Sequence, residues 1–414
     1  MSMKYLKLSD CSEFSNKRTS DIRLETYIST ENMVPNKGGV VKAESIPDCK
    51  TTSKYEPHDI LLSNIRPYFC KIWYADREGS CSNDVLVVKA KKGFLPKFLY
   101  YVLSDQNFFN YDTVTSKGTK MPRGSKNAIM KYFVPDLDIA TQRRIASILS
   151  AYDNLIENNT RRIRLLEQMA ENLYKEWFVR FRFPGYEKAE LVDSKLGKLP
   201  SSFQVTNMGS VFDDYIGGGW GNDEASDEFP IAASVIRGTD FPNVWHYDLS
   251  TCPRRYHKTS NYKSRQLKDG DIVMEISGGT SEQPVGRTVL VTQEIIDRFE
   301  DGRVICASFC KMIRLKKNLV SPYFFYYWMH YMYDTRIIDR FQLQSTGIIN
   351  FKFEPFLKKG LVMLPPKDIQ NAFDEQVVPL IKEINQLAVQ IDNLSRQRDL
   401  LLPRLMSGKL EVNG

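Results

Sequence analysis

Long hydrophobic runs are missing from this sequence of 414 residues. No segment of about 18 consecutive apolar residues occurs, and the aromatic stretch YFFYYWMHYMY is too short and too polar to span a bilayer. The first residues, MSMKYLKLSDCSEF, are mixed polar and lack the pattern of a secretory leader. The seven cysteines show no paired spacing, and their odd number argues against a disulfide framework. These absences predict a reduced, cytoplasmic protein without membrane contact.

The sequence also lacks recognisable catalytic and metal-binding motifs. The four histidines are scattered, and none has a partner four residues away. IGGGWG, at 216–221, has no βαβ context, and GTKMPRGSK, at 118–126, does not have the spacing of a phosphate-binding loop. The Asn-Pro-Pro-aromatic signature of amino-methylating enzymes is absent. The sequence therefore predicts that this chain has no catalytic residue, no metal site and no cofactor of its own.

The overall composition is that of an ordinary globular protein, with 42% apolar and 26% charged residues. The length allows about two to four domains. Cys306 and Cys310, in the apolar segment ICASFCKMIRL, are expected to pack in a core. The net charge of +7 permits an acidic partner but does not require one.

A long helix is predicted in the middle of the chain, from a cap at Asp138 to the Pro-Gly pair at 184–185. Apolar residues recur there with a heptad period. The seam residues are Leu149, Ile156, Ile163 and Leu173. One interpretation is a surface helix lying on a single globule. A seam this narrow instead favours a partner helix, because each exposed aliphatic side chain would forgo about 1.5–3 kcal/mol of burial.

The last part of the chain holds the predicted partner helix. Its seam residues are Val377, Ile384, Ile391, Leu394 and Leu401. Subtracting 228 from these numbers gives 149, 156, 163 and 173, the seam positions named above, and 166, where Leu166 lies near the other seam line. Gln370 falls on Gln142 by the same shift. One constant offset over so many positions predicts an internal duplication.

The segments before the two helices repeat as well. HDILLSNIRP, at 58–67, resembles GDIVMEIS, at 270–277, and each is expected to contain a short buried strand. LPKFLYYVL and VSPYFFYYWM are each expected to be an aromatic helix opened by proline. The predicted layout is globule, helix, globule, helix, with boundaries at 1–137, 138–183, 184–366 and 367–414.

The predicted fold class is α/β, of the α+β kind, with two globular domains joined by two long coiled-coil helices. Because the two ends of a compact globule lie close together, the second helix is expected to run back, antiparallel, along the first. The arrangement would have a pseudo-twofold axis. At 1.5 Å per residue, each helix would be roughly 60 Å long and would set the distance between the domains.

Basic or amide side chains gather in three loop-like segments with few acids, and beside the first predicted strand. The candidates are Asn64, Arg66, Lys117, Lys120, Arg123, Lys126, Arg254, Arg255, Lys258, Lys263, Arg265, Gln344, Ser345, Thr346 and Asn350. Charge runs in loops are often merely solvated, and this interpretation stays open. Together the segments favour a nucleic-acid surface, because Lys and Arg bind phosphates while Arg, Asn and Gln also bind base edges. The lysine-rich and amide-rich segments predict two dissimilar half-sites.

The chain resembles the specificity subunit of type I restriction-modification systems over essentially its whole length. The resemblance rests on QRRIASILSAYDNLIENNTRRIRLLEQMAENLYKEWFVRF, on LLLPRLMSGKL near the C-terminus, and on SKLGKLPSSFQV at 194–205. It implies two target recognition domains that each bind one part of a bipartite, asymmetric double-stranded DNA site. It also implies two methylase subunits docked on the paired helices, and restriction subunits that join them.

The cofactors follow the same resemblance. S-adenosylmethionine is expected on the partner methylase, and ATP and Mg on the restriction subunit. One departure is VPDLDIATQ, which is longer than the usual Pro-Pro-x-x-x-Gln entry to the helix, whereas LPPKDIQ approaches that form. No family motif fixes the base-contacting residues, so the contacts above rest on charge and loop context. The alternative is a coiled-coil adaptor that binds protein without DNA specificity.

Overall fold

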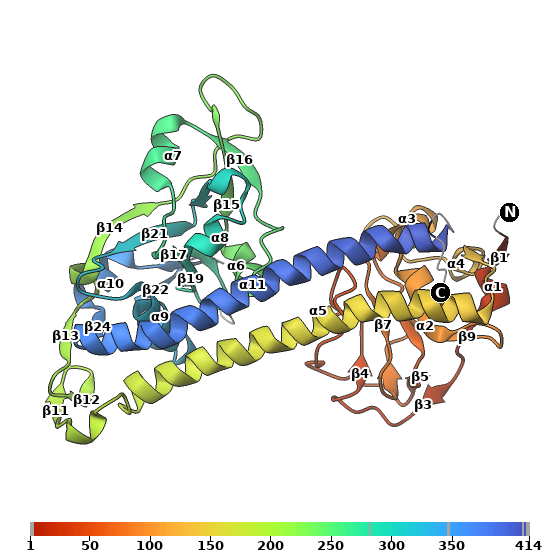
Figure 1. Cartoon of the computed structure of the whole chain (residues 1–414), viewed down its shortest axis with the longest axis horizontal. Helices are drawn as coiled ribbons and strands as arrows, with labels where there is room; N and C mark the ends of the chain where they lie inside the picture. The colour runs from red at the N-terminus through yellow and green to blue at the C-terminus, as the bar shows by residue number, and fades with distance from the viewer. Residues whose placement is uncertain (1–3, 281–282, 346–347, 408–409, 411–414) are drawn as a thin grey trace. The chain divides into compact units, whose positions relative to one another are not determined.

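The computed structural model describes residues 4–280, 283–345, 348–407 and 410, without the side chains of Gln344 and Ser345. It divides into two compact units. The first contains residues 1–157 and 392–414, and the second contains residues 158–391. Each unit therefore includes one globular part and a portion of both long helices, which are α5 (Ile139–Tyr174) and α11 (Lys367–Met406) (Figure 1).

The first unit is built on a four-stranded antiparallel sheet of order β2-β9-β6-β7. Its strands are β2 (Ser12–Phe14), β9 (Val85–Ala90), β6 (Ile60–Ser63) and β7 (Ile72–Tyr74). A second sheet has the order β3-β5-β8-β4, from Arg18–Thr19, Thr52–Tyr55, Gly79–Cys81 and Tyr27–Ile28. The remaining elements are β1 (Tyr5–Lys7), which pairs with β10 (Phe133–Pro135), α1 (Leu8–Cys11), η1 (Pro67–Phe69), α2 (Pro96–Ser104), α3 (Gln106–Thr115) and α4 (Lys126–Ile129).

The second unit repeats this plan. Its main sheet has the order β14-β21-β17-β19, again antiparallel throughout. These strands are β14 (Phe212–Gly217), β21 (Cys310–Leu315), β17 (Asp271–Glu275) and β19 (Thr288–Val291). β13 (Gln204–Asn207) pairs with β24 (Leu361–Leu364) as β1 pairs with β10. The same strand order in both units confirms the predicted internal duplication.

The other elements of the second unit surround that sheet. They are η2 (Lys175–Val179), η3 (Tyr186–Lys188), β11 (Leu191–Ser194), β12 (Gly197–Pro200), η4 (Met208–Val211), β15 (Ile231–Ile236), η5 (Gly238–Asp240), α6 (Phe241–Trp245), β16 (Arg254–His257), α7 (Thr259–Arg265), β18 (Ser277–Gly279), α8 (Gln293–Ile296), η6 (Glu300–Gly302), β20 (Val304–Cys306), α9 (Pro322–Asp334), η7 (Ile337–Phe341), β22 (Gln342–Ser345), β23 (Ile348–Phe351) and α10 (Phe353–Lys359). β16-β15-β20 and β18-β23-β22 form two further sheets.

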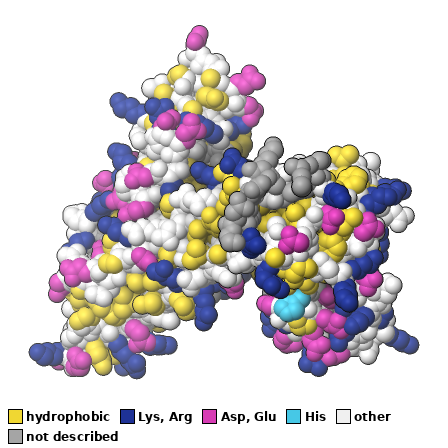
Figure 2. Space-filling view, turned by 45° about the vertical axis from the view of Figure 1, so that its right-hand side comes forward, with side chains coloured by type: hydrophobic (Ala, Val, Ile, Leu, Met, Phe, Trp, Pro, Cys, Tyr) yellow, Lys and Arg dark blue, Asp and Glu magenta, His cyan; other side chains and the backbone are white. Residues whose placement is uncertain are grey.

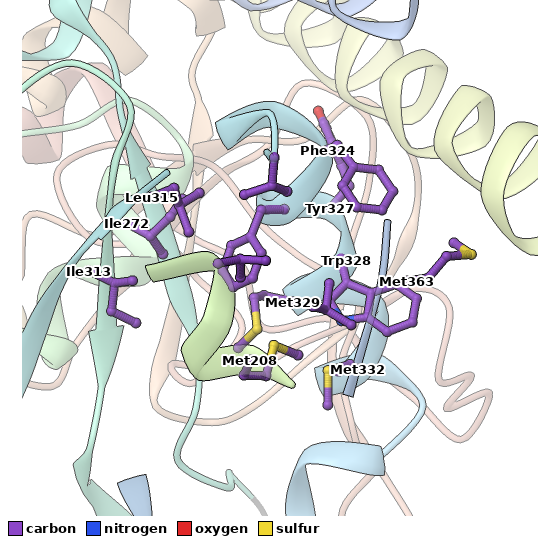
Figure 3. Packing of buried hydrophobic residues seen from close by; sticks show 14 of the residues in the cluster. Met208, Ile272, Ile313, Leu315, Phe324, Tyr327, Trp328, Met329, Met332 and Met363 are labelled. Carbon is purple, nitrogen blue, oxygen red and sulfur yellow. The ribbon is translucent and has the colours of Figure 1, made fainter. Parts of the chain in front are cut away.

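An aromatic helix covers one face of each main sheet. In the second unit, Ile272, Ile313 and Leu315 of the sheet face Phe324 and Met329 of α9 (Figure 3). Both α2 and α9 begin with proline at the first turn, as predicted, because proline there gives up no intrahelical hydrogen bond. The strands are apolar on both faces, since a second cluster containing Val273 and Val289 lies on the other side.

The long helices are antiparallel within each unit. In the first unit, Arg398 Nη1 lies 2.8 Å from Asp153 Oδ1, and Leu149 shares a buried cluster with Leu402. In the second unit, Asn159 donates to Gln390 at 3.0 Å, and Arg162 donates to Glu383 at 2.6 Å. In both units the residue number rises on α5 as it falls on α11. The antiparallel helix pair is therefore confirmed.

The predicted seam residues are buried to different extents. Leu149, Ile163, Val377 and Ile384 are buried, whereas Ile156, Leu173, Ile391, Leu394 and Leu401 are half-buried. The sequence pattern missed Leu402, which is buried next to Leu401. Near the globular parts, burial on α11 follows the 3.6-residue helical period rather than a heptad, because one face packs on a core and not only on the other helix.

The ends of α5 are fixed by local chemistry. Asp138 accepts hydrogen bonds from the backbone N–H and the hydroxyl of Thr141, both within 2.9 Å, and these bonds lower its pKa. At the other end α5 stops at Tyr174 and continues as one π-helical turn to Val179, earlier than the predicted stop at 184–185. The early end brings Trp177 and Phe178 into the core of the second unit.

Candidate nucleic-acid interface

The first basic segment is a loop that pairs with the chain after β6. Lys117 and Arg123 exchange two backbone hydrogen bonds of 2.8 and 2.9 Å, which close a tight loop. Arg66 N–H donates to the Pro122 carbonyl at 2.7 Å, and Gly124 N–H donates to the Asn64 carbonyl at 3.0 Å. The structure therefore brings Asn64 and Arg66 next to the 117–124 loop, although more than 50 residues separate Arg66 from Lys117 in the sequence.

The side chains of this loop are available to a ligand. Lys117, Lys120 and Lys126 are exposed, and none forms an ion pair with an acid in the described part of the chain. Arg123 is also exposed, and its guanidinium lies 3.2 Å from Asp84. Because an exposed ion pair contributes at most about 1 kcal/mol, a phosphate can displace this partner.

Exposed aromatic and sulfur side chains lie beside the lysines. Tyr68 is 49% exposed, and Phe69 and Met121 are exposed as well. Tyr68 and Phe69 follow Arg66 in η1, and their ring centroids are 4.8 Å apart. They are not among the candidates predicted from the sequence, although RPYF, at 66–69, joins a cation to two aromatics. Such rings can pack against sugars or bases next to bound phosphates.

A buried carboxyl group supports the loop from below. Asp112, in α3, is 0% exposed, and neither of its oxygens has a hydrogen-bond partner among the described residues. Burial alone raises its pKa to about 7. A Cβ added to Gly124 would lie 2.6 Å from Asp112 Oδ1 and 3.0 Å from Asn64 Oδ1, so only glycine fits there. The loop backbone thus packs directly on this carboxyl group.

Several basic side chains of the second basic segment form ion pairs with acids, which the sequence did not suggest. We predicted uncompensated charge there, and for Arg254, Arg255 and Lys258 this prediction is wrong. Acids from distant segments reach all three: Arg254 pairs with Glu300 and Asp301, Arg255 with Asp223, and Lys258 with Glu228. The compensating acids could not be recognised in the sequence, because the sheet of β15, β16 and β20 brings them together only in three dimensions.

Arg255 differs most from the prediction. It is 8% exposed, donates to the Trp220 and Gly221 carbonyls, and lies over the Trp220 ring at 4.5 Å. A buried guanidinium with this many partners holds the 220–223 turn against β16 rather than facing a ligand. Lys263, on α7, is exposed and has no acidic partner among the described residues. Arg265 is half-buried and donates to the Gly217 carbonyl at 2.9 Å.

The amide-rich segment forms the β22–β23 hairpin. Asn350 lies in the central strand of the sheet β18-β23-β22, where its Oδ1 accepts from Ser277 Oγ at 2.6 Å. Gln344 and Ser345 belong to β22, and their side chains are not described. Thr346 lies outside the described residues. The hairpin pairs with the chain that follows β17, and the 117–124 loop pairs with the chain that follows β6. β17 and β6 hold the same place in the two main sheets, since each is the third strand in its sheet order.

On the side drawn in Figure 2, the basic side chains do not gather into one broad patch. Figure 2 shows lysines and arginines interspersed with acids on the side that it draws. In the part of the chain that the structure covers, no group of three or more His, Cys, Asp or Glu residues is arranged to hold a metal ion. Among the helices described, none is both long and apolar enough to cross a membrane. All seven cysteines are free, and Cys306 and Cys310 are buried, as predicted.

The chain is similar to known proteins in both sequence and structure. Residues 4–168 match the family described as type I restriction modification DNA specificity domain. The chain is 24% identical to the type I restriction enzyme MjaIX specificity subunit of Methanocaldococcus jannaschii, over 78% of this chain and 71% of that protein. It is 22% identical to the HindI specificity subunit of Haemophilus influenzae, over 93% and 94% of the two chains.

A solved structure has the same fold. The S subunit of a type I restriction-modification system from M. genitalium aligns with a TM-score of 0.54 and 14% identity, covering 98% of this chain and 96% of that one. The chain thus has a duplicated fold with a polar loop or hairpin in each repeat, similar to the fold of that S subunit. Residues 4–168 carry a type I restriction modification DNA specificity domain, and over most of its length the chain is similar to the DNA specificity subunits of type I restriction enzymes.

Proposed function

We propose that each unit binds one part of a bipartite, asymmetric DNA site. The observation that carries this proposal is the placement of a polar segment at the same position of the repeated fold, the 117–124 loop in the first unit and the β22–β23 hairpin in the second. One segment is rich in lysine and the other in amides, so the two parts of the site would differ in sequence. Lysines would bind phosphates and position the protein, while amides and arginine would bind base edges.

The chain itself would not be catalytic. It would work in the cytoplasm as part of a larger complex, with two methylase subunits docked on the long helices and restriction subunits joining them. S-adenosylmethionine would be bound by the methylase, and ATP and Mg by the restriction subunit. Exposed apolar side chains on the helices support a docking role, since Leu165 is 49% and Met169 is 56% exposed on the second unit's part of α5.

The proposal is tested by expressing the chain with a partner methylase in a host without adenine methylation and mapping modified adenines. We expect one two-part motif with unlike halves. Methylase expressed alone is the control and should modify no defined motif. A complex that forms but leaves the DNA unmodified and binds all duplexes equally would favour the alternative, a protein-binding adaptor without DNA specificity.

A further inference from the structure

A cavity of about 320 Å³ lies in the second unit, away from the basic segments described above. Its walls come from α5, from α9, from the end of α6 with the turn that follows, and from β19. Ile381 and Ile384 of α11 complete the lining. This volume is at the lower end of the range for small-molecule sites.

Three carboxyl groups, those of Glu167, Glu171 and Asp334, and four tyrosines line this cavity. Glu167 and Glu171 are one helical turn apart on α5 and therefore lie on the same face of the helix. Burial raises the pKa of Tyr326 and Tyr327, and repulsion from both carboxylates adds to the rise. The phenol oxygens of α9 and the carboxylates of α5 are thus within electrostatic reach of each other. None of the hydroxyls of Tyr247, Tyr326 and Tyr327 forms a hydrogen bond with a described residue.

Aromatic rings make up much of the remaining wall. The Trp245 ring lies 5.8 Å from the His330 ring, which is 4.3 Å from the Tyr326 ring. Trp245 is held in place because its Nε1–H donates to the Thr288 carbonyl at 2.9 Å. Tyr247 has a φ of 60°, a strained conformation for an aromatic residue, and such strain is often found at binding sites.

The lining includes three carboxyl groups and one arginine. The one arginine of the wall, Arg287, is 2.7 Å from Glu275, and both partners are buried. Burial and then Glu171 raise the pKa of Glu167 to about 7, against the opposing effect of Arg164. Glu171 is half-exposed and lies 3.8 Å from Lys175 Nζ.

A further polar group on the wall has no partner. Thr288 lines the cavity and is 2% exposed, and its Oγ1 has no hydrogen-bond partner within the described part of the chain. A buried hydroxyl without a partner is unfavourable, and a bound donor or an ordered water would supply the missing hydrogen bond. An ionised carboxylate only accepts hydrogen bonds, and the phenol and threonine hydroxyls can accept as well as donate, so the cavity can satisfy a ligand with several N–H donors.

We propose that this cavity binds the ammonium group of an aliphatic polyamine. A primary ammonium offers three N–H donors to Glu167, Glu171 and the tyrosine hydroxyls, and its positive charge is attracted by the aromatic faces. The methylene chain would be covered by the rings. Asp334 lies at the other end of α9, eight residues or about 12 Å from Tyr326. This acid, apart from the Glu167–Glu171 pair, favours a chain with more than one ammonium over a simple amine.

The test is calorimetric titration of the full-length chain, freed of nucleic acid, with spermidine. We expect saturable binding to one site, weakened about tenfold or more by Glu167→Gln and by a smaller factor by Tyr326→Phe, which removes only the hydroxyl. Glu354→Gln is the matched control, because Glu354 is an exposed acid on α10 in the same unit. Tetramethylammonium, which has no N–H donor, should bind more weakly than spermidine.

Several outcomes would overturn the proposal. They are absence of heat at millimolar spermidine, equal losses in Glu167→Gln and Glu354→Gln, or equal binding of tetramethylammonium. Thermal unfolding without ligand serves as the folding check, since Glu167→Gln removes a half-buried acid with a raised pKa and should not destabilise the unit. DNA binding by Glu167→Gln should equal that of the parent chain, so a negative result here leaves the DNA proposal untouched.

Discussion

Gln142 and Gln370 make the same three hydrogen bonds in the two repeats. The Gln142 amide accepts from Leu95 N–H at 2.8 Å and donates to the Gly93 and Leu137 carbonyls. The Gln370 amide accepts from Ser321 N–H at 2.7 Å and donates to the Leu319 and Pro365 carbonyls. Both side chains are almost fully buried. Each glutamine therefore ties the first turn of a long helix to the turn before the aromatic helix of its own unit.

The first prediction concerns this clamp. Gln370→Ala leaves one backbone N–H and two carbonyls buried without partners, which should lower the free energy of unfolding of the second unit by about 2–4 kcal/mol. Gln397→Ala, at an exposed position of α11, is the control and should change it by less than about 0.5 kcal/mol. Urea unfolding followed by tryptophan fluorescence measures both. Equal effects of the two substitutions would contradict a clamping role.

The second prediction concerns the 117–124 loop. Lys117→Ala combined with Lys120→Ala should weaken binding to every duplex alike, because phosphate contacts carry no sequence information. The slope of log K against log salt should become less steep by about 1.8, or 0.9 for each lost phosphate contact. Fluorescence anisotropy over a salt series measures the slope. Lys92→Ala, at an exposed lysine of the same unit, should leave it unchanged.

The third prediction separates a structural arginine from a candidate contact. Arg255→Ala removes a buried guanidinium and leaves the Trp220 and Gly221 carbonyls without their donor, so the second unit should lose about 2–4 kcal/mol of stability. Lys263→Ala should leave stability unchanged and weaken DNA binding. Thermal unfolding and anisotropy on both variants measure the difference. A stable Arg255→Ala variant with a specific loss of DNA affinity would reinstate Arg255 as a DNA contact.

The fourth prediction concerns pH. Asp112 has a folded pKa of about 7, above its ordinary value of 3.8, so the folded state holds the proton more tightly than the unfolded state. Its stabilising effect is complete below about pH 4, declines as the pH rises, and is lost above about pH 7.

Asp112→Asn removes this titration and keeps the shape of the side chain. The variant should be more stable than the parent at pH 8, by a few kcal/mol at most, and the difference should shrink towards pH 5. Urea unfolding at pH 5, 6, 7 and 8 measures the trend. Asp297→Asn, at an exposed aspartate of the second unit, is the control. Parallel pH profiles for the parent and Asp112→Asn would mean that the Asp112 carboxyl is not protonated in the folded chain.

The fifth prediction concerns partner docking. Leu165→Asp combined with Met169→Asp places two charges on an exposed apolar surface of α5. The chain should fold as before, because neither side chain is buried, but should retain less methylase on co-purification. Leu196→Asp, at an exposed leucine outside the helices, is the control. Undiminished retention would place the docking surface elsewhere.

The duplication could be predicted because the two halves of the sequence repeat the same pattern of side-chain types. The apolar period of the two long helices, the prolines that open α2 and α9, and the offset that joins Gln142 to Gln370 are all local features or pairwise repeats. Apolar residues at a helical period form one face that packs away from water wherever the helix lies. Their spacing is therefore the same in both repeats, even where the loops differ in length. The antiparallel helix pair could also be predicted, because the first helix enters and the second helix leaves the same compact globule, whose two ends lie close together.

The polar surfaces depended on the tertiary structure. Arg254, Arg255 and Lys258 have no acid near them in sequence, yet loop and turn segments 30 or more residues away bring acids to each. The pairing of Arg66 with the 117–124 loop, the burial of Asp112 and the aromatic cavity also join distant segments. The sequence by itself determined which residues favour burial, because this preference depends on how polar each side chain is. Only the fold decided which charges meet, because electrostatic partners are set by distance in space.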